Sequence, residues 1–224
     1  MNKLAKFRVC VLLILLFIGV RGLCQVNDAG SWLSVNVQKK LSQAASLTFS
    51  QEVRLMENFS EAATVFSDFG IGYRLDKHFK LAANYRLVKN RRLDDSYETR
   101  NRFYADLSYR RKFDPIELIV RERFQSEFAG HNTGIRINPE LYSRTKATLK
   151  LDLDRKLVPY AYTEVFQPLN NPEARFTDKI RYCAGLEFQF TPRHMIDFNY
   201  MIQNKFNTPW ENDFVFGFGY YLTL

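Results

Sequence analysis

Hydrophobic and polar residues alternate along most of the chain beyond residue 30. In one segment Leu47, Phe49 and Val53 alternate with Thr48 and Arg54. A period of two is typical of β-strands, because successive side chains of a strand point to opposite faces. The pattern predicts eleven strands, at residues 31–38, 47–55, 64–75, 79–87, 100–110, 116–125, 141–152, 157–166, 180–190, 196–203 and 214–224. Pro159 interrupts segment 157–166, so the alternation does not reveal which of its side chains share a face.

The links between these segments alternate in length. Short, turn-like links are expected at 39–44, 76–78, 114–115, 154–156 and 191–194, and longer polar links at 57–62, 90–97, 129–139, 167–177 and 204–212. Short turns on one rim and longer loops on the other are typical of outer-membrane β-barrels. No linker-like tract divides the chain, which indicates one domain.

A soluble β-sandwich also alternates, but its strands average about five or six residues. These segments run to about 10–14 residues, close to the length that a tilted membrane strand requires. Aromatic residues recur toward the segment ends, as in interfacial girdles: Tyr73, Phe79, Tyr109, Phe113, Phe124, Phe128 and Phe190. The sequence therefore predicts an all-β protein, a single antiparallel transmembrane β-barrel of about 10–12 strands.

The strand count raises a topological question. Bacterial single-chain barrels have an even number of strands, whereas eleven candidates are found. If the rims are assigned correctly, segment 31–38 starts at the long-loop, outer rim, whereas the N-terminus of an exported chain should start on the periplasmic, short-turn side. Three explanations remain open: residues 25–30 thread the lumen, one candidate is not a membrane strand, or one segment has been divided in error.

The first residues have the pattern of a secretory signal peptide. Lys3, Lys6 and Arg8 precede the apolar run Val9–Val20, and a small-x-small site ends at Cys24. The run is 12 residues long, against roughly 20 for a membrane-spanning helix. We therefore expect residues 1–24 to be a cleaved signal peptide and residues 25–224 to be the barrel domain. An acylated Cys24 is the alternative, although Leu23 is larger than the residue that usually precedes a lipoprotein cysteine.

Composition agrees with this division. The chain holds 34 aromatic residues (20 Phe, 12 Tyr and 2 Trp) beside 56 charged ones (32 basic and 24 acidic), yet its mean hydropathy is only −0.31. Four of the 32 Lys and Arg fall in residues 1–24, so 28 remain against 24 acids, and the net charge drops from +8 to +4. Cys183 is the only cysteine after residue 24, so no internal disulfide is expected.

The polar positions of the alternating segments predict a charged lumen. Both signs are interleaved, which suits ion-pair ladders between neighbouring strands. The candidate lumen residues are Glu52, Arg54, Asp68, Arg74, Arg86, Arg100, Arg102, Asp106, Arg110, Glu117, Arg121, Arg123, Arg144, Lys146, Arg181, Glu187 and Asp197. Glu122 is an exception on the expected lipid face, where it would cost little if it lay near a rim.

The last segment resembles the signal by which the outer-membrane insertion machinery recognises its clients. It alternates to the final residue, with Phe214, Phe216, Phe218, Tyr220, Leu222 and Leu224 on one face. The usual signal ends in an aromatic residue, whereas this segment ends in leucine. The partners expected are therefore membrane lipid and, during biogenesis, the insertion machinery; the sequence leaves the oligomeric state open.

Candidate chemistry is sparse. His131, with Ser126 and Glu127 nearby, could form a hydrolase site at the outer rim, whereas His78 and His194 fall in short turns. No metal-ligand spacing, phosphate-binding loop or paired-cysteine motif is present, so no cofactor, metal or catalytic residue is predicted. The basic residues alternate through strands and form no patch, which gives no support to nucleic-acid binding.

Several strand patterns resemble a family of uncharacterised Gram-negative outer-membrane β-barrel proteins, known as a domain of unknown function. They are Trp32 with Val35–Leu41, Gln51–Arg54, Gly72–Leu75, Tyr85-Arg86, Asn101-Arg102, Arg121–Phe124, Pro159-Tyr160, Glu164–Phe166 and Arg181-Tyr182. The resemblance implies a barrel in the outer membrane and carries no activity. We expect a non-enzymatic barrel with a salt-bridged lumen and a structural or binding role. The alternatives are a narrow channel for small, anionic solutes and a rim hydrolase around His131.

Overall fold

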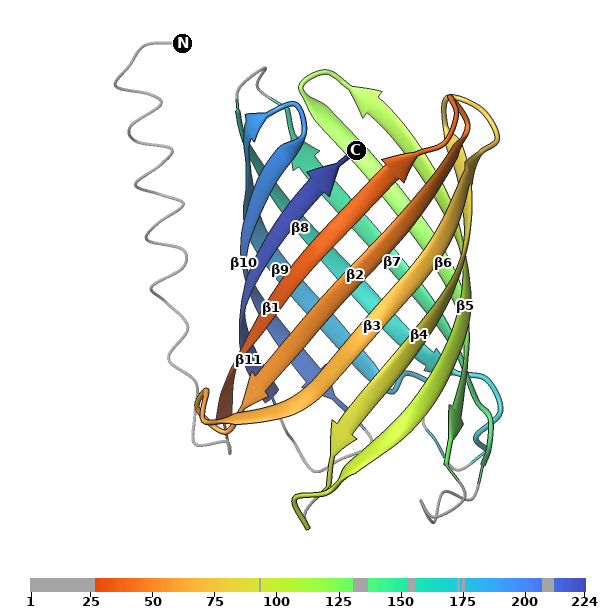
Figure 1. The fold of residues 1–224 in the computed structure, drawn as a ribbon, viewed down its shortest axis with the longest axis vertical. Helices are drawn as coiled ribbons and strands as arrows, with labels where there is room; N and C mark the ends of the chain where they lie inside the picture. Colours follow the sequence, from red (N-terminus) through yellow and green to blue (C-terminus); the bar gives the residue numbers. More distant parts are fainter. Residues whose placement is uncertain are drawn as a thin grey trace.

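The computed structural model describes residues 27–92, 94–130, 137–152, 156–172, 174, 176–206 and 212–224. Over these residues the chain forms eleven β-strands that close into one barrel (Figure 1). The strands are β1 (Asn27–Lys40), β2 (Ala45–Met56), β3 (Glu61–Arg74), β4 (Phe79–Arg91), β5 (Tyr97–Phe113), β6 (Ile116–Ala129), β7 (Glu140–Leu151), β8 (Leu157–Pro168), β9 (Lys179–Thr191), β10 (His194–Lys205) and β11 (Asn212–Thr223). Each predicted segment lies on one of them, so the all-β barrel prediction is confirmed. The expected signal peptide lies outside the described residues.

The barrel closes through a parallel pair of strands. Consecutive strands pair antiparallel, whereas β1 pairs with β11 in parallel, with Val35 opposite Tyr220. This follows from the odd strand number, because directions that alternate around a ring of eleven must repeat once. The topological question is therefore settled: all eleven candidates are barrel strands, and β1 runs from the long-loop rim to the short-turn rim, where β11 also ends (Figure 1). The expectation of a wholly antiparallel sheet was wrong at this one pair.

The links between strands differ in length at the two rims, broadly as expected. At the short-turn rim, the Asp76 carboxylate accepts hydrogen bonds from the backbone N–H groups of Phe79 (2.7 Å) and His78 (2.6 Å). These two bonds lower the pKa of Asp76 below its ordinary value. The link predicted as a long loop at 57–62 is instead a tight turn of residues 57–60, because β3 already begins at Glu61. Glu57, Asn58 and Phe59 make this turn with positive φ angles of 52°, 55° and 70°.

The outward face of the wall is apolar. Phe69, Phe103, Phe124 and Phe198 expose 53%, 52%, 59% and 55% of their surface, far more than aromatic residues of a water-soluble surface do. Outward aromatic pairs join neighbouring strands, as at Phe198 and Phe218, whose ring centroids are 5.0 Å apart. Among the described residues, no helix is long and apolar enough to cross a membrane.

The core of the protein lies inside the barrel. Cys183, Met201 and Val215 form a buried apolar cluster on the inner face of β9–β11, and Trp32 and Tyr162 pack against it. Gly185 leaves room for the ring of Tyr160 on the neighbouring strand, because a Cβ atom at residue 185 would lie 2.5 Å from that ring. Most other buried side chains of the lumen are polar or charged, which is the reverse of a soluble protein core.

The parallel closure can be tested by disulfide trapping. In a chain whose native cysteines are replaced by serine, Val35→Cys with Tyr220→Cys should crosslink readily after folding, since the two residues are register partners. The control pair Val35→Cys with Phe216→Cys is four residues out of register, about 13 Å along the strand, and should not. Migration of the unfolded chain on non-reducing gels reports the bond. Equal crosslinking of both pairs would contradict the register.

Candidate functional site

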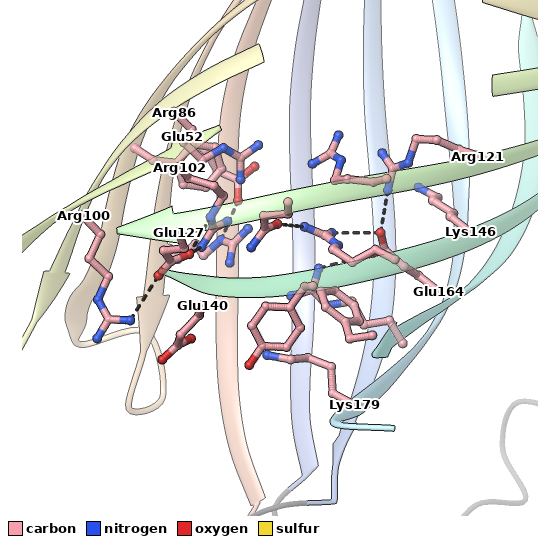
Figure 2. Close-up of a pocket in the computed structure, with 18 of the residues that line it drawn as sticks. Glu52, Arg86, Arg100, Arg102, Arg121, Glu127, Glu140, Lys146, Glu164 and Lys179 are labelled. Carbon is pink, nitrogen blue, oxygen red and sulfur yellow. Dashed lines mark hydrogen bonds and ion pairs between the residues drawn. The ribbon is translucent and has the colours of Figure 1, made fainter. Parts of the chain in front are cut away.

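A cavity of about 380 Å³ lies inside the barrel, in the half toward the long-loop rim (Figure 2). Its charged lining is strongly unbalanced, with ten cationic side chains and four carboxylates. The cations are Arg54, Arg86, Arg100, Arg102, Arg121, Arg123, Arg144, Lys146, Lys179 and Arg181, and the carboxylates are Glu52, Glu127, Glu140 and Glu164. Strands β2–β9 all contribute to the lining, with Phe66 from β3, because alternation sends every second side chain of each strand inward.

The centre of the cavity is organised around Glu164. Its side chain is almost fully buried, with 4% exposed, and it accepts hydrogen bonds from Arg121 (2.5 Å), Arg144 (2.8 Å) and Arg181 (3.4 Å). The strand register explains this convergence. Arg121, Lys146, Glu164 and Arg181 occupy one row across β6, β7, β8 and β9, so Arg121 and Arg181 reach the carboxylate within the row. Arg144 reaches it from two residues before Lys146 on β7.

A second cluster surrounds Glu127, nearer the long-loop rim. Arg102 donates through Nε to this carboxylate at 2.6 Å, and Arg100 donates through Nη1 at 3.1 Å (Figure 2). Arg100 also pairs with Glu98 at 2.9 Å. Two arginines thus hold Glu127 from the adjacent strand β5, and this cluster is close to neutral.

Arginine–aromatic contacts also line the inner wall of the barrel. The guanidinium carbon of Arg54 lies 3.7 Å from the ring centroid of Trp32, and that of Arg86 lies 3.8 Å from Phe66. Arg144 stacks on Phe166 at 4.2 Å. Such contacts contribute about 0.5–2 kcal/mol each. They also hold the long cationic side chains flat against the wall, which leaves space between them.

The remaining predicted lumen residues form separate pairs. Asp106 holds Arg123 through two hydrogen bonds of 2.7 and 2.8 Å, and Asp68 accepts from Arg86 at 2.6 Å and from Tyr104 at 2.5 Å. Toward the short-turn rim the pairs are Lys150–Glu187 (2.6 Å), Tyr160–Asp197 (2.7 Å) and Arg110–Glu117 (3.3 Å). Arg74 is exposed at the end of β3. The cavity therefore collects ten of the seventeen candidates.

Alternation alone did not identify every lining residue. Glu127 was considered only as part of a rim hydrolase, although it continues the inward row of Arg121 and Arg123 on β6. Glu164 lies in the segment that Pro159 interrupts, where Tyr162 and Phe166 also face inward and small residues face outward. On β8 the large aromatic side chains face the lumen, so the rule that assigns large apolar residues to the lipid face gives the wrong orientation for this strand.

The structure separates two members of the possible hydrolase site. Glu127 points inward and is bound to Arg100 and Arg102. Ser126 directly precedes it on β6, so its side chain points to the opposite, outward face. The two side chains therefore do not share a site. His131 lies outside the described residues. His194 is at the short-turn rim, where its Nδ1 lies 2.6 Å from the Tyr220 hydroxyl.

Glu122 lies in the middle of β6, opposite Leu107 and Thr145 in the register. Burial of this outward carboxylate was expected to cost little free energy only if Glu122 lay near a rim. The structure places it away from both rims. Instead the hydroxyl groups of Ser143 and Thr145 donate hydrogen bonds to the carboxylate, the second at 2.6 Å. Two neighbouring donors thus compensate part of its desolvation.

Two further sequence features can be located. The alternating residues Phe214, Phe216, Phe218, Tyr220 and Leu222 lie on β11, and their role as an insertion signal stays a prediction. Within the described ranges Cys183 is a free, buried cysteine, and no group of three metal-ligating side chains comes together.

Replacing the shared carboxylate should destabilise the barrel more than replacing one in an isolated pair. Glu164→Gln leaves three buried guanidinium groups without their counter-charge, so the free energy of unfolding should fall by about 3–5 kcal/mol. The matched change Glu187→Gln affects only Lys150, in a pair whose side chains are 20% and 19% exposed, and should cost about 1 kcal/mol or less. Urea unfolding of the refolded variants in chloride buffer measures both. Equal losses would show that Glu164 is not the central partner.

Three solved structures align with most of this chain. The beta domain of the Bordetella autotransporter BrkA aligns with a TM-score of 0.51 and 10% identity, over 81% of this chain and 84% of that one. LpxR from Salmonella typhimurium aligns with a TM-score of 0.51 and 7% identity, over 80% and 83%. The NanC porin aligns with a TM-score of 0.47 and 12% identity, over 76% and 87%. At these identities the likeness concerns the fold alone.

A comparison with curated proteins gave no match. A family model does match, over residues 29–213, which spans nearly all of the barrel. The resemblance inferred from the strand patterns is therefore confirmed. The chain belongs to the family described as protein of unknown function DUF2490.

Proposed function

We propose that this protein is a non-enzymatic β-barrel of the bacterial outer membrane whose lumen binds small anions entering from the long-loop side. The exposed apolar face of the wall supports the membrane location, because so large an apolar surface is stable only against lipid. The fold shared with two outer-membrane barrels supports it as well. The expected signal peptide and the terminal insertion signal belong to the same proposal.

The observation that carries the binding role is the charge of the cavity. Its lining holds six more cationic side chains than carboxylates. Four of these cations pair with carboxylates just outside the lining, which are Asp68, Glu98, Asp106 and Asp178. A local excess of two positive charges remains. A purely structural, salt-bridged filling would be balanced, because each unpaired buried charge costs several kcal/mol of desolvation. An excess of one sign inside a low-dielectric wall instead concentrates ions of the opposite sign. The imbalance therefore favours an anion-binding lumen over an inert one.

A non-enzymatic role is proposed because the described lining offers ion-pairing groups and no nucleophile joined to a base. Glu127, the carboxylate nearest to the possible rim hydrolase, is held by two arginines and faces away from Ser126. A variant His131→Ala with unchanged lipid or ester turnover, should any be found, would remove the hydrolase alternative.

The preference for anions can be measured at Trp32, whose ring contacts Arg54 and Arg181 of the cavity lining. In a Trp210→Phe variant, Trp32 is the only tryptophan. Iodide should quench its fluorescence at least about threefold more strongly than caesium, relative to the same ratio for a free tryptophan derivative, because the cations enrich anions locally. Neutral acrylamide controls for access. Quenching by acrylamide together with equal quenching by the two ions would contradict the proposal.

Single-channel recording in planar bilayers separates a binding barrel from the second candidate, a narrow anion channel. A binding barrel gives no discrete conductance steps. Steps whose reversal potential shows anion selectivity would establish the channel, for which the same cationic lining would act as the filter. Cation-selective steps would contradict both.

A further inference from the structure

The cations around Glu164 exceed what their protein partners can neutralise. Arg121, Arg144 and Arg181 all donate to this one carboxylate, and Lys146 occupies the register position between Arg121 and Glu164. Arg123, which lies beside Arg144 in the register, has its own partner in Asp106. Four cations therefore share a single negative charge on the inner wall of β6–β9.

Several donors of this cluster have no acceptor. The Nε–H groups of Arg121 and Arg144 are buried without a hydrogen-bond partner among the described residues. The Lys146 ammonium lies over the ring of Tyr162, 3.5 Å from its centroid, and forms no ion pair with a carboxylate of the described chain. Buried donors are almost always satisfied in proteins, so the two Nε–H groups point to an acceptor that the chain does not supply, and the Lys146 ammonium lies on the same strand as Arg144.

The unpaired donors and the excess positive charge define the chemistry of that acceptor. It must carry about two or more negative charges to balance the cluster, and several oxygens to accept from donors on different strands. A halide has no such oxygens, and a carboxylate has one charge and two oxygens in a plane. A phosphate group has three or more oxygens in a tetrahedral arrangement and about two charges near neutral pH, and guanidinium forks match it well.

The size and lining of the cavity limit the rest of the ligand. A volume of about 380 Å³ lies at the lower end of small-molecule sites, so it admits more than a single ion but only a small molecule. The aromatic faces of Phe166 and Tyr162 are already covered by Arg144 and Lys146. The accessible lining is therefore charged and hydrogen-bonding, which suits a hydrophilic body and not an apolar one.

We propose that Arg121, Arg144, Lys146 and Arg181 form a binding site for a phosphate group, either as inorganic phosphate or as the head of a small hydrophilic phosphate monoester. This inference rests on the proposed anion-binding lumen and specifies its ligand. Glu164 holds the three guanidinium groups together in the absence of ligand, and Lys146 supplies the charge that has no protein partner.

Lys146 offers a variant that separates binding from folding. Lys146→Gln removes a cation that pairs with no carboxylate, so the fold loses no ion pair. The lost contact with the Tyr162 ring is offset by the relief of repulsion from Arg121 and Arg144. Phosphate binding should weaken at least about tenfold, as for the loss of a charged hydrogen bond, while the urea midpoint should fall far less than in Glu164→Gln. Lys146→Met, which keeps the side-chain volume over Tyr162, serves as a second variant. Lys150→Gln is the matched control, since Lys150 is paired with Glu187 outside the cavity.

Calorimetric titration of the refolded full barrel in chloride-containing detergent buffer makes the test. Inorganic phosphate and glycerol 3-phosphate are titrated separately. Saturable binding that Lys146→Gln and Lys146→Met weaken and Lys150→Gln leaves unchanged supports the site, and the tighter of the two probes identifies the source of the phosphate group. No saturable binding of either probe, or equal binding by all variants, overturns it. The iodide preference at Trp32 would persist in that case if only the phosphate site is wrong, and would be lost if the anion-binding lumen itself is wrong.

Discussion

Closure of the sheet between β1 and β11 is the constraint on which the rest of this structure depends. An open sheet of this length would expose two edges of unpaired backbone groups, which neither lipid nor a protein interior tolerates. The parallel pair removes both edges. It also creates an inside and an outside, and from then on the two-residue period of each strand assigns every side chain to one of two very different environments.

The inner environment explains the electrostatics. Side chains from all strands converge on a space too narrow to hydrate them fully, so charges must find partners within the wall. Most do, as at Arg123 with Asp106 and at Lys150 with Glu187. Around Glu164 they do not, because β6, β7 and β9 each place a cation in the same row as the single carboxylate of β8. The local excess of positive charge is thus a consequence of register, and it is the feature that gives the lumen a binding role.

The outer environment is simpler, and its exceptions are informative. Outward positions are mostly large and apolar, as lipid requires, yet Glu122 faces outward from the middle of β6. Its carboxylate is held by Ser143 and Thr145 on the neighbouring strand. Outward polar groups are therefore tolerated where adjacent strands supply the missing hydrogen bonds, just as buried ones are inside.

Prediction from the sequence succeeded where local alternation carries the information and failed where neighbouring strands decide. The tight turn after Met56 looked like a loop because its polar residues continue into β3, whose start depends on pairing with β2. Segment 157–166 could not be oriented, since Tyr162 and Phe166 face the lumen beneath Lys146 and Arg144. Aromatic residues inside are favourable only because those cations cover them, and the cations come from another strand.

By itself, the sequence determined the strands, the barrel class and most of the charged inner face, because each follows from a period of two within one segment. The tertiary structure alone decided the parallel closure, the convergence of Arg121, Arg144 and Arg181 on Glu164, and the donors left without acceptors. These depend on the register between strands distant in sequence. Register is set by the closure of the whole ring, which no single segment encodes.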